Sequence, residues 1–231
     1  MRAARLMLAA LALGGAMPAN TALAEPMPPV AGLSDAGPVL EMDYTNPGLT
    51  PAHWVLTIWP DGSGHFRSER GHAPMDPEGG FEAADLDRDI QVSAEFAGRV
   101  FQAVHRSNLL NAECESHMKV AFQGWKKLTY TGPDGGRECT FNYSKNKEIQ
   151  WLGESLVAVA GAIVEGARLE TLLQHDRLGL DKEMEYLQEA FGDGRVQQLC
   201  AIRGILERLA NDPEVMDRVR KRARTLLARA D

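Results

Sequence analysis

Cysteine and histidine are the side chains of this sequence whose types and spacing could do chemistry. Cys114 is followed by His117, and this Cys-x-x-His spacing is typical of zinc ligands. Cys139 or His105 would have to complete the site, because structural zinc takes four ligands. The sequence offers no second closely spaced pair, so it favours another use for Cys114.

We expect Cys114 and Cys139 to form a disulfide bond. Cys114 follows a predicted helix and Cys139 is on the inward face of a predicted strand, so a bridge would join helix end and sheet. In the chain-entropy model a loop of this size stabilises the fold by roughly 3 kcal/mol. Two buried free thiols are the alternative, because connectivity does not follow from sequence.

A catalytic thiolate paired with His117 would need an exposed, activated cysteine. Cys200 is expected to be a small core residue.

A run of alternating acids could bind calcium. Asp85, Asp87 and Asp89 match positions one, three and five of a calcium loop. That pattern then requires glycine and glutamate where this chain has Ile90 and Phe96. The alternative is an acidic, solvated loop before a helix, whose positive N-terminus favours nearby acids. We therefore expect no cofactor, and calcium at these three residues stays open as the metal candidate.

No catalytic constellation is recognised in the sequence. Ser63 is between two glycines in a hairpin turn, which is the wrong context for a nucleophile elbow. The zinc-protease and phosphate-loop motifs are absent from the sequence, and its six histidines are scattered. A carboxylate pair for glycoside hydrolysis is not identifiable among 32 acids. We assign no catalytic residue.

A basic run near the end of the chain could attract an anionic membrane or a nucleic acid. It consists of Arg218, Arg220, Lys221, Arg222, Arg224 and Arg229. We favour a structural interpretation, because cations in the last turns of a helix complement its dipole. The formal net charge of −7 also argues against binding to nucleic acid, whose phosphates need clustered cations.

Tryptophans on predicted strands are candidates for a binding surface. Trp54 and Trp59 have opposite parity, so in a regular strand one of them faces away from the other. An outward tryptophan would suit a carbohydrate or protein partner. The alternative is that a neighbouring loop or the tail covers it.

The elements that would position these residues alternate between hairpins and helices over residues 39–175. Apolar and polar alternation predicts strands at 40–44, 54–59, 65–67, 125–130 and 139–143. Helical spacing of apolar residues predicts two helices, Ser93–Arg106 and Glu148–Gln174. A long acidic loop is predicted at 71–89. This order predicts an α+β domain with an antiparallel sheet of about five strands and helices on one face.

Residues 176–231 are predicted to form a three-helix extension packed on that domain. Asp181 is the expected cap of a helix that ends at Phe191, and the apolar residues from Val196 to Leu209 mark the next. Asp212-Pro213-Glu214 has the composition of a helix start and is expected to open the last helix. A single solenoid repeat is a weaker interpretation, because such repeats need about three units for stability.

The first 24 residues have the composition of a secretory signal peptide. Arg2 and Arg5 precede the apolar stretch Leu6–Met17, and an A-x-A site predicts cleavage after Ala24. Twelve apolar residues are too few for a retained anchor, which needs about 20. Residues 25–38 follow as a flexible leader rich in proline, alanine and glycine. We therefore expect a periplasmic or secreted protein without a transmembrane segment after cleavage, in a compartment that allows disulfides.

The pattern of hairpin, helix, hairpin and helix resembles a group of secreted bacterial proteins of unknown function. The likeness rests on Trp54–Trp59 with Pro60-Asp61-Gly62, on Val92-Ser93 before a helix, and on Leu128–Tyr143. It implies no activity.

The leading hypothesis is a non-catalytic module that binds an unknown protein or envelope component. One alternative is a hydrolase of an envelope polymer with carboxylates from the 71–89 loop. Another is a structural protein that self-associates through its tail helices.

Overall fold

Alternating strands build one antiparallel sheet in the computed structural model. The structure describes residues 37–69 and 85–230. The predicted signal peptide (1–24), residues 25–36 of the leader and residues 71–84 of the predicted loop lie outside them. The six strands are β1 (Val39–Thr45), β2 (His53–Ile58), β3 (Ser63–Glu69), β4 (Leu86–Gln91), β5 (Trp125–Gly132) and β6 (Gly135–Phe141).

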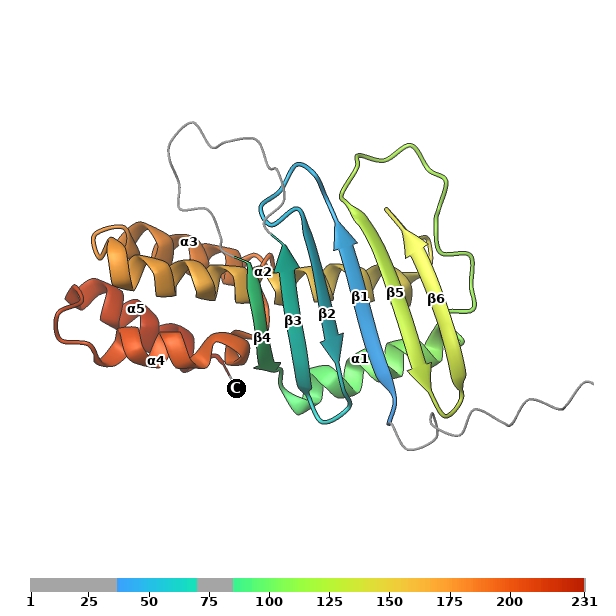
Figure 1. The fold of residues 1–231 in the computed structure, drawn as a ribbon, viewed down its shortest axis with the longest axis horizontal. Helices are drawn as coiled ribbons and strands as arrows, with labels where there is room; N and C mark the ends of the chain where they lie inside the picture. Colours follow the sequence, from blue (N-terminus) through green and yellow to red (C-terminus); the bar gives the residue numbers. More distant parts are fainter. Residues whose placement is uncertain (1–36, 70–84, 231) are drawn as a thin grey trace, which may run out of the picture. The chain divides into compact units, whose positions relative to one another are not determined.

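The strands lie in the order β4-β3-β2-β1-β5-β6, and every neighbouring pair is antiparallel (Figure 1). Strand β1 is the seam between the two predicted hairpins, because it pairs with β2 on one side and with β5 on the other. Along β1, Leu40, Met42 and Tyr44 are buried. Glu41 and Asp43 point to the opposite face, as the period of two requires.

Strand β4 was not predicted from the sequence. Residues 86–89, which the sequence suggested were part of an acidic loop, form β4 and pair with β3. Leu86 and Ile90 are buried on the core side, while Asp87 and Asp89 point to solvent. Aspartate is uncommon in strands, which explains the wrong prediction. An outermost strand with one solvated face tolerates it, and charges there discourage pairing with other chains.

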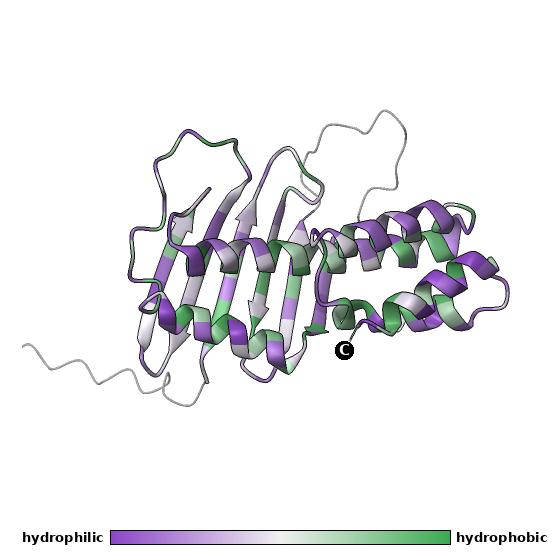
Figure 2. Ribbon diagram, turned by 180° about the vertical axis from the view of Figure 1, so that it is seen from behind, coloured by the Kyte–Doolittle hydropathy of each residue, from purple (hydrophilic) through white to green (hydrophobic). Residues whose placement is uncertain are grey.

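Two helices, α1 (Ala94–Arg106) and α2 (Lys147–His175), cover one face of the sheet. Figure 2, which views the molecule from behind, shows both helices in front of the strands. The predicted cap of α1 is confirmed, because the Ser93 hydroxyl accepts the Phe96 N–H. The Asn146 side chain caps α2 in the same way. Their apolar faces and the inward side chains of the sheet form one hydrophobic core.

The second half of α2 carries a further hydrophobic core, shared with the tail. The tail contains α3 (Leu180–Gly192), the short 3₁₀ helix η1 (Leu199–Ile202), α4 (Arg203–Asn211) and α5 (Asp217–Leu227). In the described part of the chain, none of the helices combines the length and the apolarity that crossing a membrane requires.

Two predicted helix starts in the tail are wrong. The last helix begins at Asp217, and the Asp212 carboxylate instead accepts the Glu214 N–H within a turn. Helix α3 begins at Leu180, so Asp181 is inside the helix rather than its cap. Aspartate is common both at caps and in turns, and Asp212 forms a turn here. The Asp181 carboxylate instead pairs with Arg218 and Arg222 of α5.

Candidate functional site

A disulfide fastens the segment between α1 and β5 to the sheet. We call this segment, residues 112–124, the strap. The sulfur atoms of Cys114 and Cys139 are at bonding distance and their Cα atoms are 5.8 Å apart, as predicted. Neither sulfur in this bridge is available as a zinc ligand or a nucleophile. Burial raises the pKa of the remaining thiol, Cys200, so that side chain is also a poor nucleophile.

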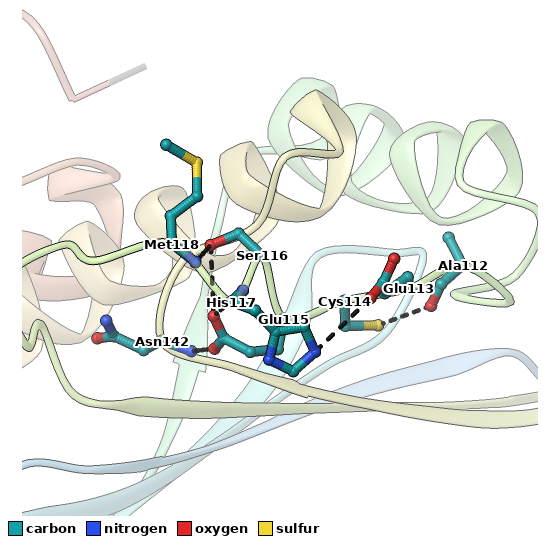
Figure 3. Close-up of polar contacts among 8 residues, drawn as sticks. All are labelled: Ala112, Glu113, Cys114, Glu115, Ser116, His117, Met118 and Asn142. Carbon is teal, nitrogen blue, oxygen red and sulfur yellow. Dashed lines mark hydrogen bonds and ion pairs between the residues drawn. The ribbon is translucent and has the colours of Figure 1, made fainter.

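The carboxylate of Glu115 fixes the strap beyond the disulfide. It accepts the backbone N–H of Asn142 at 2.7 Å and that of His117 at 3.1 Å (Figure 3). Burial raises the pKa of Glu115, but these backbone donors outweigh it and hold the pKa below the usual value. His117 points toward Glu113, with 3.6 Å between Nε2 and Oε1, and both side chains are exposed. These contacts are structural. Because Cys114 is in the disulfide, His117 has no cysteine thiolate to activate.

Lys126 is a buried polar residue that the sequence analysis missed. Its Nζ donates to the carbonyl of Asn142 at 3.0 Å and to that of Gly124 at 3.4 Å, below the strap. Only 3 % of the residue is exposed, and burial lowers its pKa. Its parity with Leu128 and Tyr130 was the signal that could have identified an inward lysine.

The other face of the sheet is not covered by any described helix, and we call it the open face (Figure 1). The strand register arranges its side chains in rows that cross the sheet. The first row contains Asp89, His65, Thr57, Glu41, Thr129 and Glu138. The second contains Asp87, Arg67, Val55, Asp43, Lys127 and Thr140. A third, shorter row contains Glu69, His53, Thr45 and Trp125.

Each histidine of the open face is between two carboxylates. The ring of His65 contacts Asp89 through Nδ1 at 2.9 Å and Asp87 through Nε2 at 3.2 Å. His53 contacts Asp43 at 3.1 Å and, more distantly, Glu69 at 3.9 Å. Each ring thus offers its two nitrogens to two acids, which positions the imidazole on the sheet surface.

The calcium candidates Asp85, Asp87 and Asp89 gain no support from this geometry. Asp87 and Asp89 direct oxygens at the His65 ring, whereas calcium takes six to eight oxygen ligands. Within residues 37–69 and 85–230, no group of three or more acidic, histidine or cysteine side chains is arranged to hold a metal ion. Calcium binding remains a prediction.

An aromatic pair borders the open face. Trp125 belongs to its third row and is 49 % exposed. Phe122, from the strap, is 51 % exposed and packs edge-on with a centroid distance of 6.0 Å from Trp125. Of the two tryptophans with opposite parity, Trp54 is buried against Tyr44, whereas Trp59 just beyond β2 is partly exposed. Trp125 is therefore the exposed tryptophan within the described strands.

The basic run near the C-terminus is largely engaged within the tail. Arg218 and Arg222 both form ion pairs with Asp181. Arg220 pairs with Asp217, and Arg224 donates to a backbone carbonyl of α4. These contacts favour the structural interpretation of the run.

A shallow cavity of about 750 Å³ lies beside the β5–β6 hairpin. Glu113, Arg137 and Glu138 contribute its charged lining. Among the described residues, those of the predicted 71–89 loop, where the hydrolase hypothesis places its carboxylates, do not line this cavity.

The sequence matches no known family model, and the search of curated proteins gave no significant match.

Proposed function

We propose that this protein is a non-catalytic binding module of the periplasm or the exterior, and that the open face receives its macromolecular partner. The observation that carries the proposal is a broad sheet surface, free of described helices and bordered by the exposed pair Phe122 and Trp125. Exposed aromatic side chains beside polar groups are enriched at interfaces, because they bury a large apolar area and lose few rotamers.

The polar composition of the open face fits a transient partner better than a permanent one. Permanent interfaces resemble a hydrophobic core, whereas transient ones are about as polar as the rest of the surface. Here threonine hydroxyls, carboxylates and two imidazoles make up most of the surface, and the aromatic pair is at its border. The polar groups of such a surface are hydrated when it is free, and they can form many hydrogen bonds with a bound partner.

The alternatives have less support in the described residues. Two of the three described acids that a hydrolase was expected to use, Asp87 and Asp89, are 71 % and 96 % exposed on a strand rather than gathered in a cleft. The apolar sides of α3, α4 and α5 pack against one another and α2, so they are already occupied within one molecule.

A photocrosslinking experiment tests the proposal. A benzophenone amino acid replaces Thr57 at the centre of the open face, and in a control protein it replaces the exposed Lys221 of α5. With envelope extract of the source organism, we expect a discrete adduct from position 57 that position 221 does not give. The substitution Trp125→Ala should weaken it. Equal adducts from both positions, or fragments released from purified envelope polymer by the protein, would contradict the proposal.

A further inference from the structure

The open face carries a strong excess of negative charge. Six carboxylates point from its strands to solvent: Glu41, Asp43, Glu69, Asp87, Asp89 and Glu138. Two permanent cations share it, Arg67 and Lys127. With the histidines counted as neutral, the described strands therefore leave four net negative charges on this surface.

The two cations are paired with two of the six acids, and Lys127 also interacts at longer range with Asp43 and Glu41. The other four acids form two columns. Lys127 pairs with Glu138 at 2.9 Å, and Arg67 pairs with Glu69 at 3.2 Å. The first column is Glu41 and Asp43 on β1, and the second is Asp87 and Asp89 on β4. Within the described residues, none of these four carboxylates has an ion pair with lysine or arginine; histidine is the partner of three of them.

The distance between the columns matches a repeat of an extended polypeptide. Strands β2 and β3 separate β1 from β4, so the columns are three strand spacings, about 14 Å, apart. An extended chain advances about 3.3 Å per residue, so residues four apart span nearly the same distance and point to the same side. Two basic side chains at positions i and i+4 would therefore each meet one column.

The space between the columns is compatible with such a segment. His65, Thr57 and Val55 occupy it as short or flat side chains, and Arg67 is drawn toward Glu69. On the far side of β1, the Trp125 ring would offer a third contact, since aromatic faces attract cations and apolar groups alike.

We infer that the open face binds an extended cationic polypeptide segment, with basic residues four positions apart seated on the β1 and β4 acidic columns. This inference rests on the proposed function and adds the chemistry of the partner. The face would repel polyanions, since phosphate groups need clustered cations.

Capped serine peptides supply the first test. One peptide carries two arginines four residues apart, a second of the same composition has them adjacent, and a third carries glutamates four apart. The mature protein is titrated into each labelled peptide at low ionic strength, and binding is measured by fluorescence anisotropy. We expect the spaced arginine peptide to bind about fivefold more tightly than the adjacent one. Added salt should weaken binding, and the glutamate peptide should not bind.

Neutralised variants supply the second test. Glu41→Gln with Asp43→Asn neutralises the β1 column, and Asp87→Asn with Asp89→Asn neutralises the β4 column. Each double variant should bind the spaced arginine peptide about fivefold more weakly. Each should also bind the spaced and the adjacent peptide equally well. Glu185→Gln with Glu207→Gln, on α3 and α4, removes the same charge elsewhere and should change nothing. The spacing comparison needs no variant, so it stands even if a substituted protein folds poorly.

The outcomes separate this inference from the proposed function. Equal binding of both arginine peptides, or binding that survives loss of both columns, would overturn the cationic segment. In that case the crosslinked adduct at position 57 can still be informative. If its yield falls in Trp125→Ala but is unchanged by added salt and by neutralising the columns, the partner is uncharged, for example a neutral glycan. The proposed function would survive in that case, and the inference would not.

Discussion

Glu165 is the most unusual titratable residue in the described chain. It is on α2, facing Glu183 of α3, with Arg168 and Arg195 as the nearby cations. One of its carboxylate oxygens, Oε2, is buried without a hydrogen-bond partner in the described structure. Burial first, and then the hydrogen bond and charge of Glu183, raise the pKa of Glu165 to about 8.

This raised pKa makes the stability depend on pH in a defined direction. An ordinary glutamate in the unfolded chain titrates near 4.5, so between that value and about 8 the folded state holds a proton that the unfolded state has lost. The free energy of unfolding should therefore be highest below pH 4.5, as far as this group is concerned, and should fall as pH rises to 8.

Glu165→Gln should remove that dependence, because the amide keeps a donor for Glu183 and has no charge to bury. We expect the variant to be more stable than wild type by on the order of 2 kcal/mol at pH 8, with a smaller difference at pH 5. Urea unfolding at both pH values measures it. The exposed Glu207→Gln serves as control, and a gain of the same size at both pH values would argue against a buried proton.

The disulfide makes a separate prediction. Replacing Cys114 and Cys139 together by serine should lower the free energy of unfolding by about 3 kcal/mol, because the bridge closes a loop of 25 residues. Denaturant titration with and without reductant measures the loss. Cys200→Ser is the matched control and should leave the reductant sensitivity unchanged; a wild-type protein insensitive to reductant would contradict the structural role.

At the scale of elements, a glycine permits the close approach of α2 and η1. A Cβ atom at Gly166 would collide with Cγ2 of Ile202 and lie 3.0 Å from its Cβ. The branched carbon is close to the backbone of η1, so it has little freedom to move away. This contact is one of those that attach the tail to α2.

Gly166→Ala should therefore destabilise the protein by about 2 kcal/mol through overpacking. Gly204→Ala on α4 is the control, since a methyl group there would have nothing within 4 Å, and alanine should stabilise that helix by about 0.5–1 kcal/mol. Thermal unfolding of both variants compares them. Two changes of the same sign would show that helix propensity, rather than the contact with Ile202, decides the outcome.

The elements that could be predicted from sequence were those with an unbroken period. Strand β1 and helix α1 follow their apolar spacing, and Ser93 caps α1 as its type suggests. Strand β4 was missed because it is short and contains two aspartates, which are uncommon in strands. Its only apolar residues are Leu86 and Ile90, and its pairing with β3 is a tertiary contact. Helices on one face of the sheet were predicted, which leaves the other face uncovered, but the residues that meet in the rows of that open face were not predicted. Its rows unite residues from six strands, and the register that aligns them is set by tertiary pairing.

At the scale of the whole molecule, the predicted signal peptide can be tested directly. If residues 1–24 direct export, the mature protein should begin at Glu25. N-terminal sequencing of the protein from fractionated cells checks both the cleavage site and the compartment. Alanine substitution is of little use at an A-x-A site, so Ala24→Asp is the appropriate variant, and it should leave a longer, cell-retained precursor. An unprocessed wild-type chain in the cytoplasm would contradict export.

The place of β1 in the sheet has a consequence for folding kinetics. Its pairing with β5 joins residues roughly 80 to 90 positions apart, whereas the β1–β2 and β5–β6 hairpins pair residues close in sequence. Local contacts form faster than distant ones, because a long loop must close first. Oxidation of Cys114 with Cys139 needs only the second hairpin and the strap, so we expect it to precede closure of the seam. Thiol trapping during refolding would reveal an oxidised intermediate whose β1 amides still exchange with solvent. If the signal peptide directs export, the chain should pass through the same order of events after translocation.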